Sequence, residues 1–138
     1  MQIRYEATKG SDPLVRVTTN LEEDLIALKR LFLSLANMDP PSSMSLRRLA
    51  WIDFVNIGDF VLRRVQPSER PVPTIRLAER RAEPAIIDWS GDREDWVTRA
   101  ELVEGLFASP EPGHQYLTGY ESLDPIEVEV SFREGSEE

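Results

Sequence analysis

Carboxylates and tryptophans are concentrated in one short segment that could carry chemistry. Its members are Asp88, Trp89, Asp92, Glu94, Asp95 and Trp96. Paired carboxylates can act as general acid and base where their surroundings separate their pKa values, and carboxylates also bind Mg²⁺ or Ca²⁺. The spacing does not match an EF-hand loop, which needs alternating ligands, a central glycine and a terminal glutamate. Helix capping by Asp92, with Glu94 and Asp95 at the positive end of the helix, accounts for most of the cluster.

The single histidine, His114, follows Pro112 and Gly113 at the entry to a short segment. An imidazole in this place could act as a general base or a metal ligand, but no cysteine, second histidine or serine-rich elbow accompanies it. We therefore expect a partly exposed side chain that bonds to nearby backbone. A hydrolase that uses Asp88, Asp92 and His114 with a divalent metal is the third of three functional hypotheses.

Three arginine pairs lie in the middle of the chain: Arg47-Arg48, Arg63-Arg64 and Arg80-Arg81. Clustered arginines attract phosphates, but a formal net charge of −9 repels a nucleic acid at long range. The sequence also lacks a phosphate-binding glycine loop and a nucleotide fingerprint. We expect these arginines to pair with the acidic third of the chain, and we expect no nucleic-acid binding.

Charge is segregated along the chain. Residues 82–138 hold 15 acidic residues against 3 arginines, whereas residues 47–81 hold 8 arginines against 4 acidic residues. Like charges repel one another, so this division suggests an acidic surface that faces a cationic partner. The pattern does not identify the partner.

Length and composition indicate one domain. The chain has 138 residues, of which 41% are hydrophobic, and that is enough for a single core. We expect an α+β domain over residues 1–133 and a frayed acidic tail over 134–138. No cysteine is present, no apolar run approaches the roughly 18–20 residues that span a bilayer, and the N-terminus lacks a signal pattern. A cytoplasmic protein without membrane contact or cofactor is the expectation, with no indication of its oligomeric state.

The first elements have clear local signals. Ile3, Tyr5 and Ala7 alternate with polar residues, turn chemistry follows over residues 9–13, and residues 14–18 are rich in β-formers, which predicts a hairpin. Asn20 and Glu23 have the spacing of a capping box, so a helix is predicted over residues 21–36. Asn37 and the following prolines end it.

The second half of the chain is less uniform. Residues 45–65 fit either strands or a helix, and we prefer two strands because β-branched and aromatic residues dominate. A loop is predicted over 66–73, strands over 74–78 and 85–89, and a second helix after Asp92. In the last segment Ile126, Val128, Val130 and Phe132 alternate with Glu127, Glu129, Ser131 and Arg133, which predicts a strand with one buried and one solvent-facing side. The predicted class is α+β: a single domain with an antiparallel or mixed sheet and two main helices packed against it.

The leading functional hypothesis is a small acidic module of bacterial type that binds, and neutralises or chaperones, a basic protein partner, as an immunity protein or inhibitor does. The expected partner-binding residues are Glu94, Glu101, Glu104, Glu127 and Glu129, with Tyr116 and Tyr120 as aromatic anchors. We expect no catalytic residues and no metal site. The alternative is a structural or accessory subunit of a multi-protein assembly.

Overall fold

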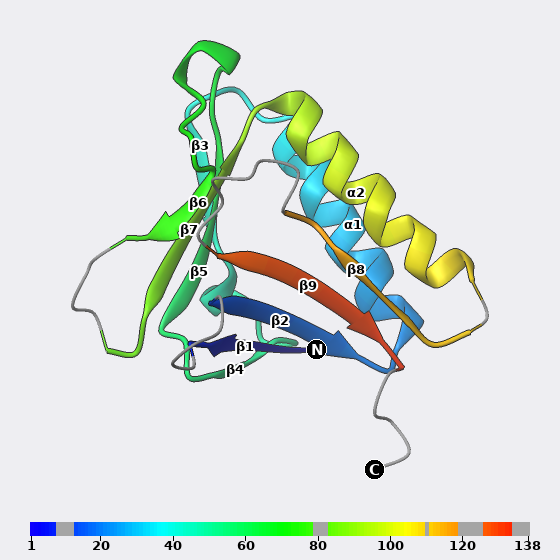
Figure 1. The fold of residues 1–138 in the computed structure, drawn as a ribbon. Coiled ribbons are helices and arrows are strands. Elements are labelled where there is room, and N and C mark those ends of the chain that lie inside the picture. The colour runs from blue at the N-terminus through cyan, green and yellow to red at the C-terminus, as the bar shows by residue number, and fades with distance from the viewer. Residues whose placement is uncertain (8–12, 79–82, 110, 119–125, 134–138) are drawn as a thin grey trace.

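Two mixed β-sheets and two helices surround one apolar core (Figure 1). The structure is a computed structural model of the chain and describes residues 1–7, 13–78, 83–109, 111–118 and 126–133. Helices α1 (Glu22–Ala36) and α2 (Arg93–Ala108) pack side by side along the sheets. This arrangement confirms the predicted α+β class with mixed sheets and two main helices.

The first sheet has five strands in the order β4-β1-β2-β9-β8. The strands are β1 (Gln2–Glu6), β2 (Leu14–Thr19), β4 (Asp53–Val55), β8 (Gly113–Tyr116) and β9 (Glu127–Phe132). Strands β1 and β2 are antiparallel, which confirms the predicted hairpin. Strand β9 lies parallel to β2, with Leu14 opposite Glu127, so the two ends of the chain share the centre of this sheet.

The second sheet has four strands in the order β3-β5-β7-β6. The strands are β3 (Ser42–Ser45), β5 (Asp59–Arg64), β6 (Ile75–Leu77) and β7 (Ile86–Gly91), and two short 3-10 turns are η1 (Leu46–Arg48) and η2 (Pro67–Glu69). The preference for strands over a helix in residues 45–65 is confirmed by β4 and β5. Gly58 precedes β5, where a Cβ atom would lie 2.9 Å from the carbonyl oxygen of Pro84, so a side chain there would collide with backbone.

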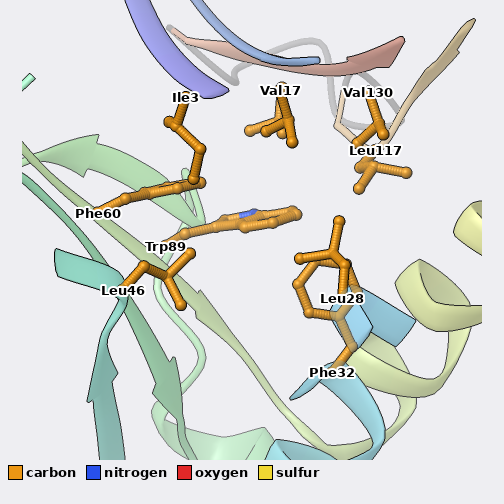
Figure 2. A pocket seen from close by; sticks show the side chains of 10 residues that line it. Ile3, Val17, Leu28, Phe32, Leu46, Phe60, Trp89, Leu117 and Val130 are labelled. Carbon is orange, nitrogen blue, oxygen red and sulfur yellow. The ribbon is translucent and has the colours of Figure 1, made fainter. Parts of the chain in front are cut away.

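Trp89 lies at the centre of the core, where the two sheets meet α1 (Figure 2). Its indole is parallel to the ring of Phe60 at a centroid distance of 5.7 Å and meets the ring of Phe32 edge-on at 5.8 Å. Ile3 and Val17 face it from the five-stranded sheet (Figure 2). The space left between these side chains is about 10 Å³ and has an apolar lining. A space of this size is at the lower limit for one water molecule, so the side chains around Trp89 are closely packed.

The start of α1 differs from the prediction. Asn20 does not cap the helix; Leu21 occupies the N-cap position and makes no side-chain hydrogen bond. Thr19 instead connects the end of β2 to the start of the helix, because its Oγ1 accepts from the Leu21 N–H at 3.1 Å and donates to Asp24 Oδ2 at 2.6 Å. The Met1 ammonium also pairs with Asp24, at 3.1 Å. The prediction of a capping box between Asn20 and Glu23 is therefore wrong, because β2 continues to Thr19 and the chain then enters the helix directly.

The solvent-facing side predicted for the last strand is also wrong. Glu129 is 7% exposed and Ser131 is 4% exposed. Strand β9 has β2 on one side and β8 on the other, and long side chains from both neighbours cover this face. Alternation in the sequence correctly assigns each residue to a face, but the position of the strand within the sheet decides whether that face meets water.

Candidate partner-binding surface

Helix α2 carries the exposed carboxylates that the sequence predicts for partner binding. Its start is fixed by a capping box, in which the Asp95 N–H donates to Asp92 Oδ1 and the Asp92 N–H donates to Asp95 Oδ2, both at 2.9 Å. The prediction that Asp92 caps this helix is thus confirmed. The buried side contains Trp96, Arg99, Ala100, Val103 and Leu106. The opposite side is in contact with solvent.

Glu94, Glu101 and Glu104 are all exposed on that opposite side, and we call these three residues the acidic face of α2. Glu104 pairs with Lys29 of α1 at 3.3 Å and keeps half of its side chain exposed. Among the residues that the structure describes, Glu94 and Glu101 form no ion pair. Two carboxylates on a firmly anchored helix therefore remain available to a cationic partner.

Glu127 and Glu129 lie on a different surface. Val128 and Val130 of the same strand point into the core beside Leu28 and Phe32 of α1, so the two glutamates point away from the helices. The structure therefore does not join them to the acidic face of α2. The predicted set of five glutamates is divided between two sides of the molecule.

Glu129 is also occupied by partners within the chain. Its carboxylate lies 3.3 Å from Arg16 Nε and accepts a hydrogen bond from Ser131 Oγ at 2.8 Å. Tyr116 on β8 donates to the same carboxylate, and this hydrogen bond, together with the charge of Glu129, raises the pKa of the tyrosine hydroxyl. Tyr116 is 40% exposed, whereas Glu127 is half-buried. Tyr120 lies outside the described residues.

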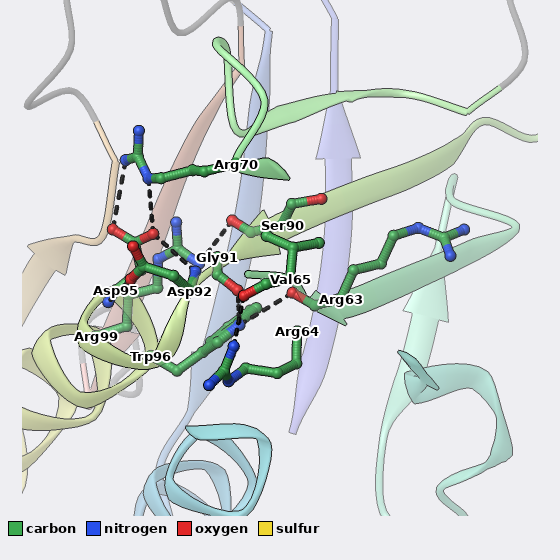
Figure 3. Close-up of polar contacts among 10 residues, drawn as sticks. All are labelled: Arg63, Arg64, Val65, Arg70, Ser90, Gly91, Asp92, Asp95, Trp96 and Arg99. Carbon is green, nitrogen blue, oxygen red and sulfur yellow. Dashed lines mark hydrogen bonds and ion pairs between the residues drawn. The ribbon is translucent and has the colours of Figure 1, made fainter. Parts of the chain in front are cut away.

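Asp95 connects α2 to the loop that follows β5 (Figure 3). The Arg70 side chain donates to its two carboxylate oxygens at 2.7 and 3.3 Å. Burial alone would raise the pKa of Asp95, but the Arg70 hydrogen bond, the Asp92 N–H and the charges of Arg99 and Arg70 outweigh burial and lower it. This bridge holds the first turn of α2, and with it Glu94, in a fixed position.

The lowered pKa of Asp95 predicts a specific pH dependence. The ionised carboxylate is stabilised in the folded state, so its contribution is present above its ordinary value of 3.8 and is lost as the pH falls through the lower folded-state value. We expect Asp95→Asn to be less stable than wild type at pH 7 and the difference to narrow as the pH falls from about 5 to about 2. Urea unfolding at several pH values measures this. A difference that stays constant or widens in acid would contradict the lowered pKa.

Arg99 is a buried charged residue of α2 that the sequence analysis did not identify. It is 6% exposed, its guanidinium carbon lies 4.3 and 4.5 Å from the ring centroids of Trp89 and Trp96, and it donates to the Ser90 carbonyl at 3.0 Å. Its position three residues after Trp96 and four after Asp95 places it on the buried side of α2, so helical spacing could have revealed it. The aromatic faces and the carbonyl stabilise the buried cation. We interpret it as part of the scaffold under the acidic face.

Gly91 gives this scaffold a sharp test. A Cβ atom on Gly91 would lie 2.5 Å from an Arg99 guanidinium nitrogen and 2.9 Å from Asp95 Cβ, whereas one on Gly105 would meet nothing within 4 Å. We expect Gly91→Ala to lower the free energy of unfolding by about 1–3 kcal/mol because the site is overpacked. Gly105→Ala is the matched control and should raise it by up to about 1 kcal/mol. Equal effects in chemical denaturation would argue against a tightly packed start of α2.

The residues of the hydrolase hypothesis are not brought together. Asp88 pairs with Arg63 at 3.0 Å, and Asp92 caps α2. His114 lies exposed on β8 of the other sheet, with its ring edge-on to Tyr116 at 5.8 Å. Within the described ranges, no group of three histidine or carboxylate side chains is placed to hold a metal ion. Each of these three residues has a separate place in the fold.

The arginine pairs have three different outcomes. The pairing of Arg63 with Asp88 agrees with the expectation that these residues contact the acidic third of the chain. Arg47 lies over the ring of Phe54 at 5.7 Å, and neither Arg47 nor Arg64 forms an ion pair with a described residue, so for these two the expectation stays a prediction. Arg48 is exposed, and Arg80 and Arg81 lie outside the described residues.

Within the part of the chain that the structure covers, neither helix combines the length and apolar content of a membrane-crossing segment. The chain was compared with protein-family models, with curated proteins and with solved structures, and it matches none of them.

Proposed function

We propose that the protein is a small cytoplasmic binding module that neutralises or chaperones a basic protein, in the manner of an immunity protein or inhibitor. The observation that carries this proposal is the acidic face of α2. Glu94 and Glu101 are exposed and form no ion pair with any described residue, on a helix fixed by a capping box and by the Asp95–Arg70 bridge. The formal net charge of −9 acts in the same direction.

Electrostatic attraction would act mainly during encounter. Exposed carboxylates are screened over about 8 Å at physiological ionic strength, so they attract a basic surface before contact and orient it. Exposed charges contribute little to the stability of their own fold. The exposed carboxylates of α2 can therefore be substituted without destabilising the core. Glu129 cannot, because it is buried and paired with Arg16.

A second candidate is an accessory subunit of a larger assembly. Large apolar side chains are exposed at Leu21, Val72, Leu77 and Tyr116. Leu77 belongs to β6, which lies at the edge of the four-stranded sheet and could pair with a strand of a neighbour. This candidate predicts a partner that binds through apolar contacts, with little dependence on salt.

A pull-down with two baits separates the candidates. Wild-type protein and the Glu94→Lys/Glu101→Lys variant are immobilised, and bound proteins are identified by mass spectrometry. The control bait, Asp53→Lys/Glu83→Lys, has the same change of charge at exposed positions outside α2. We expect basic proteins on the wild-type and control baits and not on the α2 variant. Capture of the same proteins by all three baits would contradict the proposal.

A further inference from the structure

Strand β3 forms one edge of the four-stranded sheet (Figure 1). Its residues, Ser42–Ser45, have the sequence SSMS, so the strand contains neither a charged side chain nor a proline. Its register with β5 is continuous, without a bulge. Proteins usually place a charge, a proline or a bulge in an edge strand to keep another strand from pairing with it. Strand β3 has none of these protections.

Pairing with β5 uses only half of the backbone groups of β3. The Val65 N–H donates to the Gly91 carbonyl at the end of β7, at 3.0 Å. Successive residues of a strand direct their N–H and C=O groups to opposite sides, so the groups of Arg64 face β3 instead. Ser42 is the register partner of Arg64, and Met44 follows two residues later. Ser42 and Met44 are therefore the residues of β3 that bond to β5.

The backbone groups of Ser43 and Ser45 point away from β5, toward the free edge. Ser43 is exposed, and Ser45 is half-buried. Outside the ladder with β5, no described residue forms a hydrogen bond with the backbone of Ser43. An added strand would find donors and acceptors here in the positions that strand addition requires.

One antiparallel register between two copies of β3 uses these groups fully. With Ser43 opposite Ser45 of the second copy, each pair exchanges both N–H···O bonds. A shift in one direction puts Pro41 in a bonding position, and proline has no N–H. A shift in the other direction requires the N–H of Arg47, which already donates to Asp59 Oδ1 at 3.2 Å.

We propose that two copies of the chain dimerise in this register, about a two-fold axis at Met44, so that their four-stranded sheets become one continuous sheet. Met44 of one copy lies opposite Met44 of the second copy in a non-hydrogen-bonded pair, in which side chains approach closely. Met44 is half-buried and packs against the core within one copy, and the second copy would cover its remaining surface. The contact shares no residue with the acidic face of α2, so either proposal can fail without the other.

Exposed charges at the two ends of β3 favour the same pairing. Asp39 precedes the strand and Arg48 follows it; both are exposed, and neither forms an ion pair with a described residue. Antiparallel pairing brings Arg48 of each copy to the end that carries Asp39 of the other, and the two-fold axis repeats this contact. Parallel pairing would place like charges together. The edge is thus complementary to itself in charge, which favours a second copy over a segment of another protein.

Sedimentation equilibrium tests for the dimer. The formal net charge of −9 repels two copies at long range, so the measurement is made at about 150 mM salt, where the screening length is about 8 Å. Protein concentrations from about 1 µM to about 1 mM cover the dissociation constants of weak complexes. We expect a reversible rise in average mass from monomer to dimer and no larger species, because an isologous contact closes on itself. A monomer at every concentration, or continued growth beyond the dimer, would overturn the proposal.

Proline at the free edge separates this contact from any other. Ser43→Pro removes the N–H that faces the edge and leaves the hydrogen bonds between β3 and β5 in place, so it should raise the dimer Kd by about tenfold or more. Ser43→Ala is the matched control, since it keeps the N–H, and it should dimerise like wild type. Equal dimerisation of Ser43→Pro and wild type would show that the copies meet through another surface.

Charge exchange tests the two-fold register and keeps the test valid if Ser43→Pro does not fold. Asp39→Arg and Arg48→Asp should each raise the dimer Kd roughly three- to thirtyfold, because the axis repeats the new like-charge contact. The double variant Asp39→Arg/Arg48→Asp restores opposite charges at both ends and should return to within about threefold of wild type. Losses that add in the double variant would reject the register.

Amide hydrogen exchange locates the contact in the wild-type protein. We expect the Ser43 and Ser45 amides to exchange more slowly as the protein concentration rises, because strand addition gives them acceptors. Exchange that is independent of protein concentration would contradict dimerisation through β3. Protection that appears only when the captured basic partner is added would assign this edge to that partner and likewise overturn the proposal of a second copy.

Discussion

Glu129→Lys is expected to lower the free energy of unfolding by about 2–4 kcal/mol. This is somewhat less than the free energy lost when a fully buried ion pair is broken, because Arg16 stays partly exposed. The substitution removes the acceptor of the Ser131 hydroxyl and of Tyr116. It also places a second cation beside Arg16 in an interior strand. Unsatisfied partners and like-charge repulsion act together at this position.

The matched control is Glu101→Lys, the same reversal at an exposed helix position. It should change the free energy of unfolding by no more than about 0.5 kcal/mol, as is usual for surface sites. Urea unfolding of both variants, analysed by linear extrapolation, gives the comparison. Similar small effects would mean that the Glu129 carboxylate is in water and that the interior position of β9 is wrong.

Charge reversal on α2 should have a large effect on binding of the basic partner and little effect on folding. We expect Glu94→Lys/Glu101→Lys to slow association with the basic partner by about tenfold or more, because attraction is replaced by repulsion during encounter. The dissociation rate should change less, since exposed rim charges contribute little after contact. Stopped-flow measurement with the captured partner separates the two rates. The control Asp53→Lys/Glu83→Lys should associate at close to the wild-type rate.

Local sequence signals predicted the elements whose stabilising contacts are local. The capping box of α2 joins residues three apart, so Asp92 and Asp95 reveal it directly. Asn20 shows the same spacing with Glu23 and yet does not cap α1, because the partner of the helix start is Thr19 at the end of a strand. Strand β2 therefore ends later, at Thr19, than the β-rich residues 14–18 predict.

Non-local pairing explains what sequence reasoning missed at the candidate sites. The burial of Glu129 depends on β9 lying between β2 and β8, and the pairing of Leu14 with Glu127 cannot be read from alternation within one strand. The predicted acidic surface was divided for the same reason. Arg64 appears in the sequence as one of a pair, and only the fold shows that its neighbour Arg63 has a carboxylate and that Arg64 has none among the described residues.

Association kinetics at several salt concentrations test whether the acidic face of α2 recruits a basic protein. Wild-type protein and Glu94→Lys/Glu101→Lys are mixed with the captured partner between about 20 and 500 mM salt, a range over which the screening length falls from tens of ångströms to a few. We expect wild-type association to slow steeply as the salt concentration rises, and its rate advantage over the variant to narrow. Association rates that are equal for the two proteins and indifferent to salt would contradict this expectation, and would favour the accessory-subunit candidate.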